Sequence, residues 1–322
     1  MKVQTFALDE KYPDVTLTSY VLDDSGELLN GKNRPAVLIM PGGGYFSCSD
    51  REAEPIALLF NQHGYHAFIL RYATYLEGKN NFPDINKPLP AKVDRCFPTQ
   101  VKQIAQAMIF IQQHAKEWFI NPSKIAICGF SAGGHNACMY ANYWNQPLIT
   151  ESFPEVDSEM LRPAACILGY PVIDYTLLKE QILQNPDSFD HQFMKAANVA
   201  FLGKELPDDE LAQKVSGNLL VNDSTPPTFI WSTFEDGLVD ATHSIVYAQA
   251  LKKQQIPFEL HVFENGGHGL SLANQATSSA QSQLDPSVAI WQELVLTWLD
   301  KRFRLDLPKY TAFEQQMMQK NQ

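Results

Sequence analysis

The sequence has no run of apolar residues long enough to cross a lipid bilayer, and its first residues lack the apolar core of a secretory signal. A spanning helix needs about 18 or more consecutive apolar residues. Basic residues are also scarce: 36 acidic side chains outnumber 25 lysines and arginines, leaving a formal net charge of -11. Nucleic acid and anionic membranes attract proteins with a basic surface. We therefore expect a soluble cytoplasmic protein that binds neither nucleic acid nor membrane.

Cysteine is too sparse and too scattered to form a disulfide framework or a metal site. The five cysteines are odd in number and include no Cys-x-x-Cys pair, the spacing that zinc and redox sites use. We expect buried, reduced thiols and no metal. The residues are Cys48, Cys96, Cys128, Cys138 and Cys166.

What the sequence does contain is a regular alternation of strand and helix patterns. With 322 residues, 45% of them hydrophobic and 19% charged, the chain can bury a large core. Short apolar runs alternate with stretches that repeat apolar residues at helical spacing, which is typical of parallel βαβ units with helices on both faces of a sheet. We predict a single α/β domain with a mostly parallel central sheet. The predicted strands are 15–22, 36–40, 66–72, 121–130, 165–174, 228–233 and 258–264, and the predicted helices are 52–63, 99–119, 132–144, 241–255 and 287–303.

Three segments interrupt the alternation. Residues 73–98 form a loop rich in proline, asparagine and lysine. The stretch 175–227 is helical in places, and we interpret it as a small cap inserted over the sheet. The tail, 305–322, is polar and rich in glutamine, and it is predicted to be a peripheral helix or a frayed end. The core of the domain is expected to span about 34–303.

The stretch GFSAGG places Ser131 between two glycines where a predicted strand meets a predicted helix. This Gly-x-Ser-x-Gly spacing, in that context, is what a nucleophile elbow requires. The sharp turn holds the serine in an unfavourable backbone conformation, at about 1–3 kcal/mol, and the glycines keep other side chains away. The following helix would direct the amide of Ala132 at the same place. For the pentapeptide alone, an ordinary Gly-rich turn is the alternative interpretation.

A serine hydroxyl needs a base and an orienting carboxylate to act as a nucleophile. His268 stands in a Gly-rich loop directly after the last predicted strand, where such a base is expected. Asp236 follows the preceding strand in an Asp-x-x-Val arrangement, and we choose it as the acid. Asp240 is the reserve choice and a better candidate for capping the next helix. Glu235 is expected to be solvated.

The other histidines fit structural roles better. His261 lies inside an alternating strand and is expected to pack there. His135 lies one helical turn past Ser131 and is expected to pack behind the elbow. A surface or half-buried position is expected for His63, His66, His114, His191 and His243.

The stretch PGGGY at 41–45 is a candidate oxyanion hole. Glycines after a central strand let backbone N–H groups approach a ligand closely. One such donor is worth about 2.7–4 kcal/mol to the transition state. We predict the amides of Gly43 and Gly44 as donors, beside that of Ala132. A phosphate loop is excluded, because no Lys-Ser/Thr pair follows and the Gly-x-Gly-x-x-Gly spacing is absent.

With serine, acid, histidine and glycine loop in place, the sequence resembles the α/β-hydrolase superfamily. The likeness is to its carbohydrate-esterase and lipase-like branch, which includes bacterial acetyl-xylan esterases and bifunctional acetyl/feruloyl esterases. It runs through MPGGGY, FPTQVKQIAQAMIFIQQHAKEWFINPSKIAICGFSAGGH, PPTFIWSTFEDGLV and FELHVFENGGHGL. The resemblance implies Ser131 as nucleophile, Asp236 and His268 as its partners, and an oxyanion hole from residues 42–44 and Ala132. It also implies two-step hydrolysis of small acyl esters such as acetyl esters, without a metal or cofactor.

The sequence departs from that family pattern in two ways. Many relatives have histidine before the glycines, where Pro41 stands here. Because backbone amides do the stabilising, we expect the hole to survive with altered support. The loop 73–98 and the insert 175–227 are expected to shape the acyl and alcohol pockets. Tyr45 is a candidate substrate contact, and Phe46, Tyr72 and Tyr75 are further pocket candidates, although such aromatic residues are as often plain core.

Other functions stay open at this stage. A serine peptidase of the prolyl-oligopeptidase type shares the elbow and the acid, but it normally carries a large additional β domain. An arylformamidase has a similar size and glycine loop. A non-catalytic binding module is a third possibility, although such modules have usually lost a member of the triad. A homodimer is expected as a guess from the fold, since nothing in the sequence identifies an interface.

Overall fold

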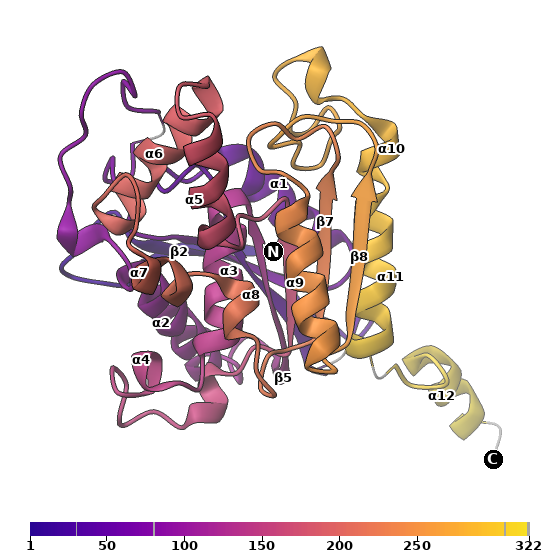
Figure 1. Cartoon of the computed structure of the whole chain (residues 1–322). Helices are drawn as coiled ribbons and strands as arrows, with labels where there is room; N and C mark the ends of the chain where they lie inside the picture. The colour runs from indigo at the N-terminus through magenta and orange to yellow at the C-terminus, as the bar shows by residue number, and fades with distance from the viewer. Residues whose placement is uncertain (30, 80, 306, 321–322) are drawn as a thin grey trace.

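The computed structural model describes residues 1–29, 31–79, 81–305 and 307–320. Within these ranges, an eight-stranded sheet crosses the molecule and helices cover both of its faces (Figure 1). The strand order is β1-β2-β4-β3-β5-β6-β7-β8. Strand β2 runs antiparallel to β1 and β4, and the other neighbouring pairs are parallel. The predicted α/β class with a mostly parallel sheet is therefore confirmed.

Most strands fall where the apolar runs predict them. They are β1 Lys2–Ala7, β2 Thr16–Val21, β3 Arg34–Met40, β4 His66–Arg71, β5 Ile120–Phe130, β6 Ala165–Gly169, β7 Thr228–Thr233 and β8 Phe258–Phe263. Strand β1 was not predicted, because its side chains are mostly exposed at the sheet edge and show no apolar pattern. Strand β6 ends five residues earlier than predicted, since Tyr170 turns the chain with φ 38°.

The helices agree with the prediction less closely at their ends. They are α1 Glu54–Gln62, α2 Thr99–Gln113, α3 Ser131–Tyr143, α4 Pro147–Thr150, α5 Tyr175–Gln184, α6 Phe189–Leu202, α7 Asp209–Lys214, α8 Gly217–Leu220, α9 Thr242–Lys253, α10 Pro286–Ala289, α11 Trp291–Phe303 and α12 Ala312–Lys320. The helix predicted over 99–119 stops at residue 113, and turns lead to Phe119, which has φ 53°. The helix predicted over 287–303 is divided into α10 and α11.

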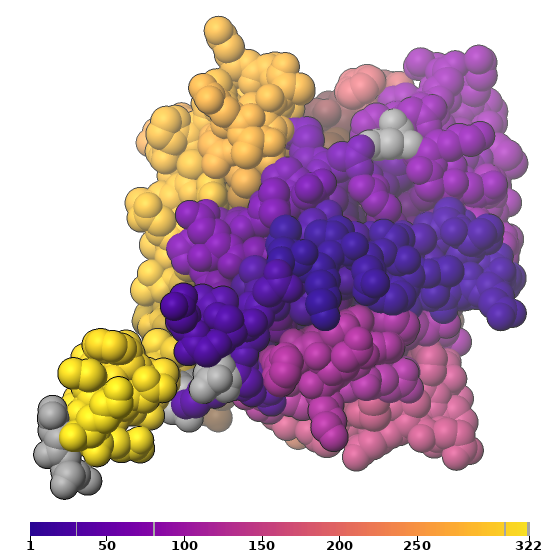
Figure 2. Space-filling view, turned by 180° about the vertical axis from the view of Figure 1, so that it is seen from behind, coloured from indigo at the N-terminus to yellow at the C-terminus, as the bar shows by residue number. Residues whose placement is uncertain are grey.

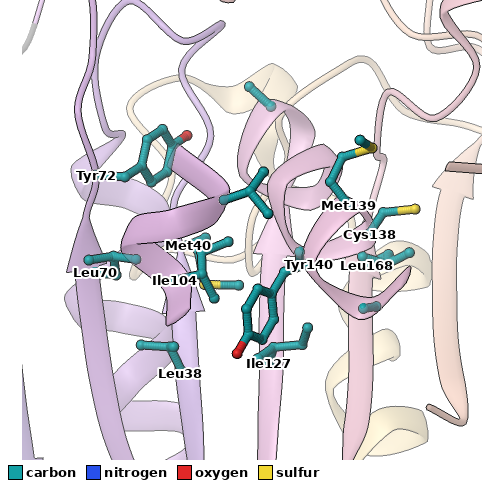
Figure 3. Packing of buried hydrophobic residues seen from close by; sticks show 14 of the residues in the cluster. Leu38, Met40, Leu70, Tyr72, Ile104, Ile127, Cys138, Met139, Tyr140 and Leu168 are labelled. Carbon is teal, nitrogen blue, oxygen red and sulfur yellow. The ribbon is translucent and has the colours of Figure 1, made fainter. Parts of the chain in front are cut away.

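Two apolar layers, one on each face of the sheet, form the core. Successive side chains of a strand point to opposite faces, so Leu38 and Met40 of β3 face α2 and α3, where Ile104 and Tyr140 lie (Figure 3). Val37 and Ile39, between them, belong to the other layer with the α11 tryptophans Trp291 and Trp298. Burying each such aliphatic side chain stabilises the fold by about 1.5–3 kcal/mol. Burial on both faces is why the central strands are continuous apolar runs.

The insert and the tail are helical. Residues 175–227 carry α5 to α8; α5 and α6 stand at the end of the molecule to which β7 and β8 point (Figure 1). The interpretation of this segment as a cap stays a prediction. In the tail, α12 stands away from the body (Figure 2). Residues 306 and 321–322 of the predicted tail, and residue 80 of the predicted loop, lie outside the described residues. In the part of the chain that the structure describes, no helix combines the length and apolar character that crossing a membrane demands.

Two of the histidines expected at or near the surface are in fact buried. His66 and His243 are each about 1% exposed, and their Nδ1 atoms accept backbone N–H groups, from Leu22 at 3.0 Å and from Asp174 at 3.1 Å, which offset the cost of burying the rings. Burial lowers the pKa of each imidazole to about 4. The expectation for these two histidines was wrong. All five cysteines are free and buried, as predicted.

Candidate active site

Ser131 stands at the junction of β5 and α3 in a strained backbone conformation, with φ 51°. Such a conformation costs a non-glycine residue about 1–3 kcal/mol and is typical of functional sites. The flanking glycines are needed for space. A Cβ on Gly129 would lie 2.1 Å from the carbonyl oxygen of Gly133, and a Cβ on Gly133 would lie 2.1 Å from that of Met40. The elbow therefore depends on close backbone contacts between β5, α3 and β3.

His268 links the serine to an acid. Its Nε2 lies 2.8 Å from Ser131 Oγ, and its Nδ1 lies 2.7 Å from Asp236 Oδ2. Asp236 is 4% exposed, and its other oxygen, Oδ1, accepts the N–H groups of Leu238 at 3.0 Å and Val239 at 2.9 Å. With Nδ1–H donating to the carboxylate, Nε2 is free to accept the hydrogen of the serine hydroxyl. The three predicted residues are thus joined in one hydrogen-bonded line.

The other two acids near this loop have different contacts. Asp240 is exposed, and its carboxylate accepts the N–H of Thr242, the first residue of α9, at 2.7 Å; the N-cap itself is Ala241, so the expectation that Asp240 is the N-cap was wrong by one residue. Glu235 is exposed as predicted, and it accepts the N–H of Gly266 at 3.0 Å. Of the three candidate acids, Asp236 alone has a hydrogen bond to His268 among the described contacts.

The surroundings of His268 favour its charged form. Burial by itself lowers the pKa of the imidazole, but the charge and hydrogen bond of Asp236 outweigh burial. The carboxylates of Glu52 and Asp190 act in the same direction, so the pKa of His268 is raised above its ordinary 6.5. The site thus stabilises the positive charge that appears when the imidazole accepts a proton.

The glycine loop lies against the elbow. Gly43 has φ 128° and Gly44 has φ 62°, and a Cβ on Gly43 would lie 2.3 Å from the carbonyl oxygen of Ser47. In the described part of the chain, no acceptor takes the N–H of Gly43 or Gly44. The amide of Ala132 lies in the first turn of α3, where N–H groups have no partner within the helix. Three donors are therefore available beside Ser131.

Two side chains contact the start of the glycine loop at Pro41 and Gly42. The hydroxyl of Tyr72 donates to the carbonyl oxygen of Pro41 at 2.7 Å, and the N–H of Gly42 donates to the Glu52 carboxyl at 2.7 Å. The residue that follows β4 and a residue of the turn after the loop thus hold Pro41 and Gly42 in place.

A cavity of about 580 Å³ opens above these groups. Its wall includes Ser131, His268, Gly43 and Gly44, together with aromatic side chains from both segments that the sequence placed at the pocket. These are Phe82 of the 73–98 loop and Phe189 and Phe193 of α6, and the ring centroids of Phe82 and Phe193 are 5.7 Å apart. A larger hollow of about 1000 Å³, beside Trp144 and Pro226, is lined by none of the predicted site residues.

The structure corrects the aromatic residues predicted at the pocket. Tyr45 is 2% exposed and does not line the cavity: its ring stacks on Phe201 at 4.3 Å, and its hydroxyl bonds to His135 Nδ1 at 2.6 Å. Tyr45 therefore supports the glycine loop from behind and is not a wall residue. The other three candidates, Phe46, Tyr72 and Tyr75, are buried too. Sequence patterns carry no signal for the phenylalanines that replace them, because those lie on irregular or surface positions.

His135 occupies the place expected for it behind the elbow. It is fully buried, and its Nε2 bonds to the carbonyl oxygen of Val215 at 2.8 Å. Burial lowers its pKa to about 4. His135 is therefore a neutral packing residue between α3 and the insert.

Comparison with known proteins gives one matching family and several relatives. The BD-FAE family model matches residues 28–251, a range that includes the glycine loop, Ser131 and Asp236. Endo-1,4-beta-xylanase B of Butyrivibrio fibrisolvens is 33% identical over 249 residues, 77% of this chain and 34% of that protein. Acetylxylan esterase of Xylanibacter ruminicola is 30% identical over 238 residues, 73% of this chain and 40% of that protein. The chain thus spans well under half the length of these two relatives.

Similarity to a solved structure extends over almost the whole chain. The acetyl ester-xyloside bifunctional hydrolase from Caldicellulosiruptor lactoaceticus has 30% sequence identity and a TM-score of 0.66, covering 89% of this chain and 88% of that one. In contrast to the two relatives above, this similarity covers most of the solved chain as well as most of the present one. The architecture of this chain is therefore found in a solved hydrolase of nearly the same length.

Proposed function

The chain belongs to the BD-FAE family and has the α/β-hydrolase fold, and from this premise we propose that it is a serine carboxylic-ester hydrolase. The observation that carries the proposal is the hydrogen-bonded line from Ser131 through His268 to Asp236 at the floor of a cavity. The relatives support small acyl groups as substrates, because two of them have names that specify acetyl esters. Acetylated carbohydrate is therefore our first choice of substrate.

The proposed reaction has two steps. His268 takes the proton of Ser131 while Oγ attacks the acyl carbon, and the amides of Gly43, Gly44 and Ala132 stabilise the oxyanion. His268 then protonates the departing alcohol, which leaves an acyl group on Ser131. Water repeats the sequence and releases the acid. We further propose that the enzyme acts in the cytoplasm on small-molecule esters, as a homodimer.

A panel of p-nitrophenyl esters from acetyl to octanoyl, with an acetylated xylo-oligosaccharide, tests this function. We expect kcat/KM to be highest for acetyl, and we expect acetate release from the oligosaccharide. A formyl-aromatic amide and a prolyl peptide substrate in the same panel represent the arylformamidase and peptidase alternatives. Preference for either of these, or no turnover of any ester, would contradict the proposal.

The activity should fall as the medium becomes acidic. Only neutral His268 accepts the serine proton, so activity is lost as pH falls through its pKa, which is raised above 6.5. We expect the acid midpoint of kcat/KM above pH 6.5. Asp190→Asn removes one carboxylate that favours the imidazolium and should move the midpoint to lower pH. Asp187→Asn, at an exposed position three residues earlier, is the control and should leave it in place. A midpoint that moves to higher pH in Asp190→Asn would contradict the proposed effect of the Asp190 carboxylate on the pKa of His268.

A further inference from the structure

A short turn after the glycine loop holds a buried carboxyl group that, apart from the effect of its charge on His268, has no role in the proposed steps. The turn is η1, Asp50–Glu52, and Glu52 is only 4% exposed. Its Oε2 accepts the N–H of Gly42 at 2.7 Å, and its Oε1 accepts the O–H of Tyr170 at 2.6 Å. Burying a carboxyl group is costly, and a neutral side chain of similar size is often no worse for stability. Folding by itself therefore does not explain this group.

Tyr170 extends the link to the loop that carries His268. The tyrosine oxygen, which donates its hydrogen to Glu52, accepts the N–H of Ser271 at 3.0 Å. Its ring also lies edge-on to the imidazole of His268, with the centroids 5.1 Å apart. One carboxyl group thus connects the loops that follow β3, β6 and β8.

Arg51, the neighbouring residue of the same turn, holds the histidine loop directly. Its guanidinium donates to the carbonyl oxygens of Gly269, at 2.9 Å, and of Thr277. The hydroxyl of Ser271 donates back to the carbonyl oxygen of Arg51 at 2.6 Å. The turn η1 is therefore bound on one side to the glycine loop and on the other side to the residue after His268.

Glu52 lies close enough to the reacting groups for its placement to matter. A Cβ on Gly42 would lie 2.8 Å from Glu52 Oε2 and 2.9 Å from Ser131 Cβ, so the carboxyl group and the serine both pack against this glycine. A shift of the Gly42 peptide moves the amides of Gly43 and Gly44, which follow it. Misplacement by about 1 Å can cost about 100-fold in rate. Burial raises the pKa of Glu52, although the bonds from Tyr170 and Gly42 oppose the rise.

We propose that Glu52 is a positioning residue, which holds the Gly42 peptide and, through Tyr170, the His268 loop in register with Ser131. This inference rests on the proposed esterase function, since the register matters only if these groups react together. Glu52 is itself part of the cavity wall, but in this role it makes no contact with the reacting atoms of the substrate. It acts through the two loops that do.

The test is Glu52→Gln, which keeps the size of the side chain but offers one acceptor oxygen to two donors. We expect kcat on p-nitrophenyl acetate to fall about 10- to 100-fold, because the loops lose their register, while KM stays within about threefold. The variant should stay folded with a modestly lower melting temperature, because one buried donor loses its acceptor while the cost of a buried charge is removed. Glu54→Gln is the matched control, two residues further on at an exposed position, and should behave as wild type.

Tyr170→Phe removes the other half of the link and carries the test if Glu52→Gln does not fold. The two substitutions together should cost less than the product of their separate effects, because they break one chain of hydrogen bonds. The positioning role alone is overturned if kcat is unchanged in both variants. It is also overturned if kcat falls only in proportion to the amount of folded protein. A wild-type protein that neither hydrolyses esters nor reacts with a fluorophosphonate overturns the proposed function, and this inference with it.

Discussion

Ser131→Ala is expected to lower kcat on p-nitrophenyl acetate by about 10⁶-fold, the scale found when a triad nucleophile is removed. The reason is local: alanine keeps the backbone turn but has no oxygen 2.8 Å from His268 Nε2 to attack the ester. The rate of p-nitrophenol release by the purified protein measures the loss of kcat, and labelling with a fluorophosphonate measures the loss of the reactive serine. The variant should bind substrate with little change, because the cavity wall and the oxyanion donors stay in place.

Ser123→Ala is the control, since this serine is exposed on the same strand, β5, outside the predicted site. It should retain wild-type kcat and label fully. A Ser131→Ala enzyme that keeps its activity, or still reacts with the fluorophosphonate, would refute Ser131 as the nucleophile. The binding-module alternative predicts a different pattern, in which wild type and variant are equally inert.

Asp236→Asn is expected to lower kcat by about 10⁴-fold, the scale known for this change in a serine triad. The N–H groups of Leu238 and Val239 both donate to Oδ1, so the asparagine oxygen should remain with them. The asparagine NH₂ group then faces His268 Nδ1 and donates to it. This forces the imidazole proton onto Nε2, where it blocks acceptance of the serine proton.

Asp240→Asn makes the comparison specific, because Asp240 is the acid that the sequence left in reserve. Its carboxylate contacts the N–H of Thr242 and has no described bond to His268. We expect kcat to stay within about twofold of wild type, with little change in stability, because the asparagine oxygen can still accept the N–H of Thr242. Equal losses in the two variants would mean that Asp236 has no special role.

The chain order of the candidate triad was predictable because each member follows an apolar strand. Parallel strands place their carboxyl ends at one edge of the sheet, so residues after β5, β7 and β8 are brought together although they are far apart in sequence. The buried strands were equally predictable, since helices on both faces make them apolar throughout. Strand β1 escaped prediction because it lies at an exposed edge, where no apolar pattern is required.

The parts that sequence patterns missed depend on contacts between irregular segments. Phe82 lies in a loop and Phe193 on α6, and only the fold brings their rings to 5.7 Å. Tyr45 illustrates the opposite error: it follows the glycine loop directly, but its side chain turns inward to stack on Phe201. The direction in which a side chain points after a turn depends on the backbone angles. Its position next to the glycine loop in the sequence therefore does not show whether it faces the cavity.

The sequence by itself determined the alternation of strands and helices in the core, the elbow at Ser131 and the choice of His268, because periodicity and motif spacing are local properties that hydrophobic burial imposes. Only the tertiary structure decided that Asp236 and not Asp240 meets the imidazole, which rings line the cavity, and that Glu52 joins the loops. Those outcomes depend on distances of a few ångströms between segments remote in the chain. Such distances are set by the packing of the whole domain, and no short stretch of sequence contains them.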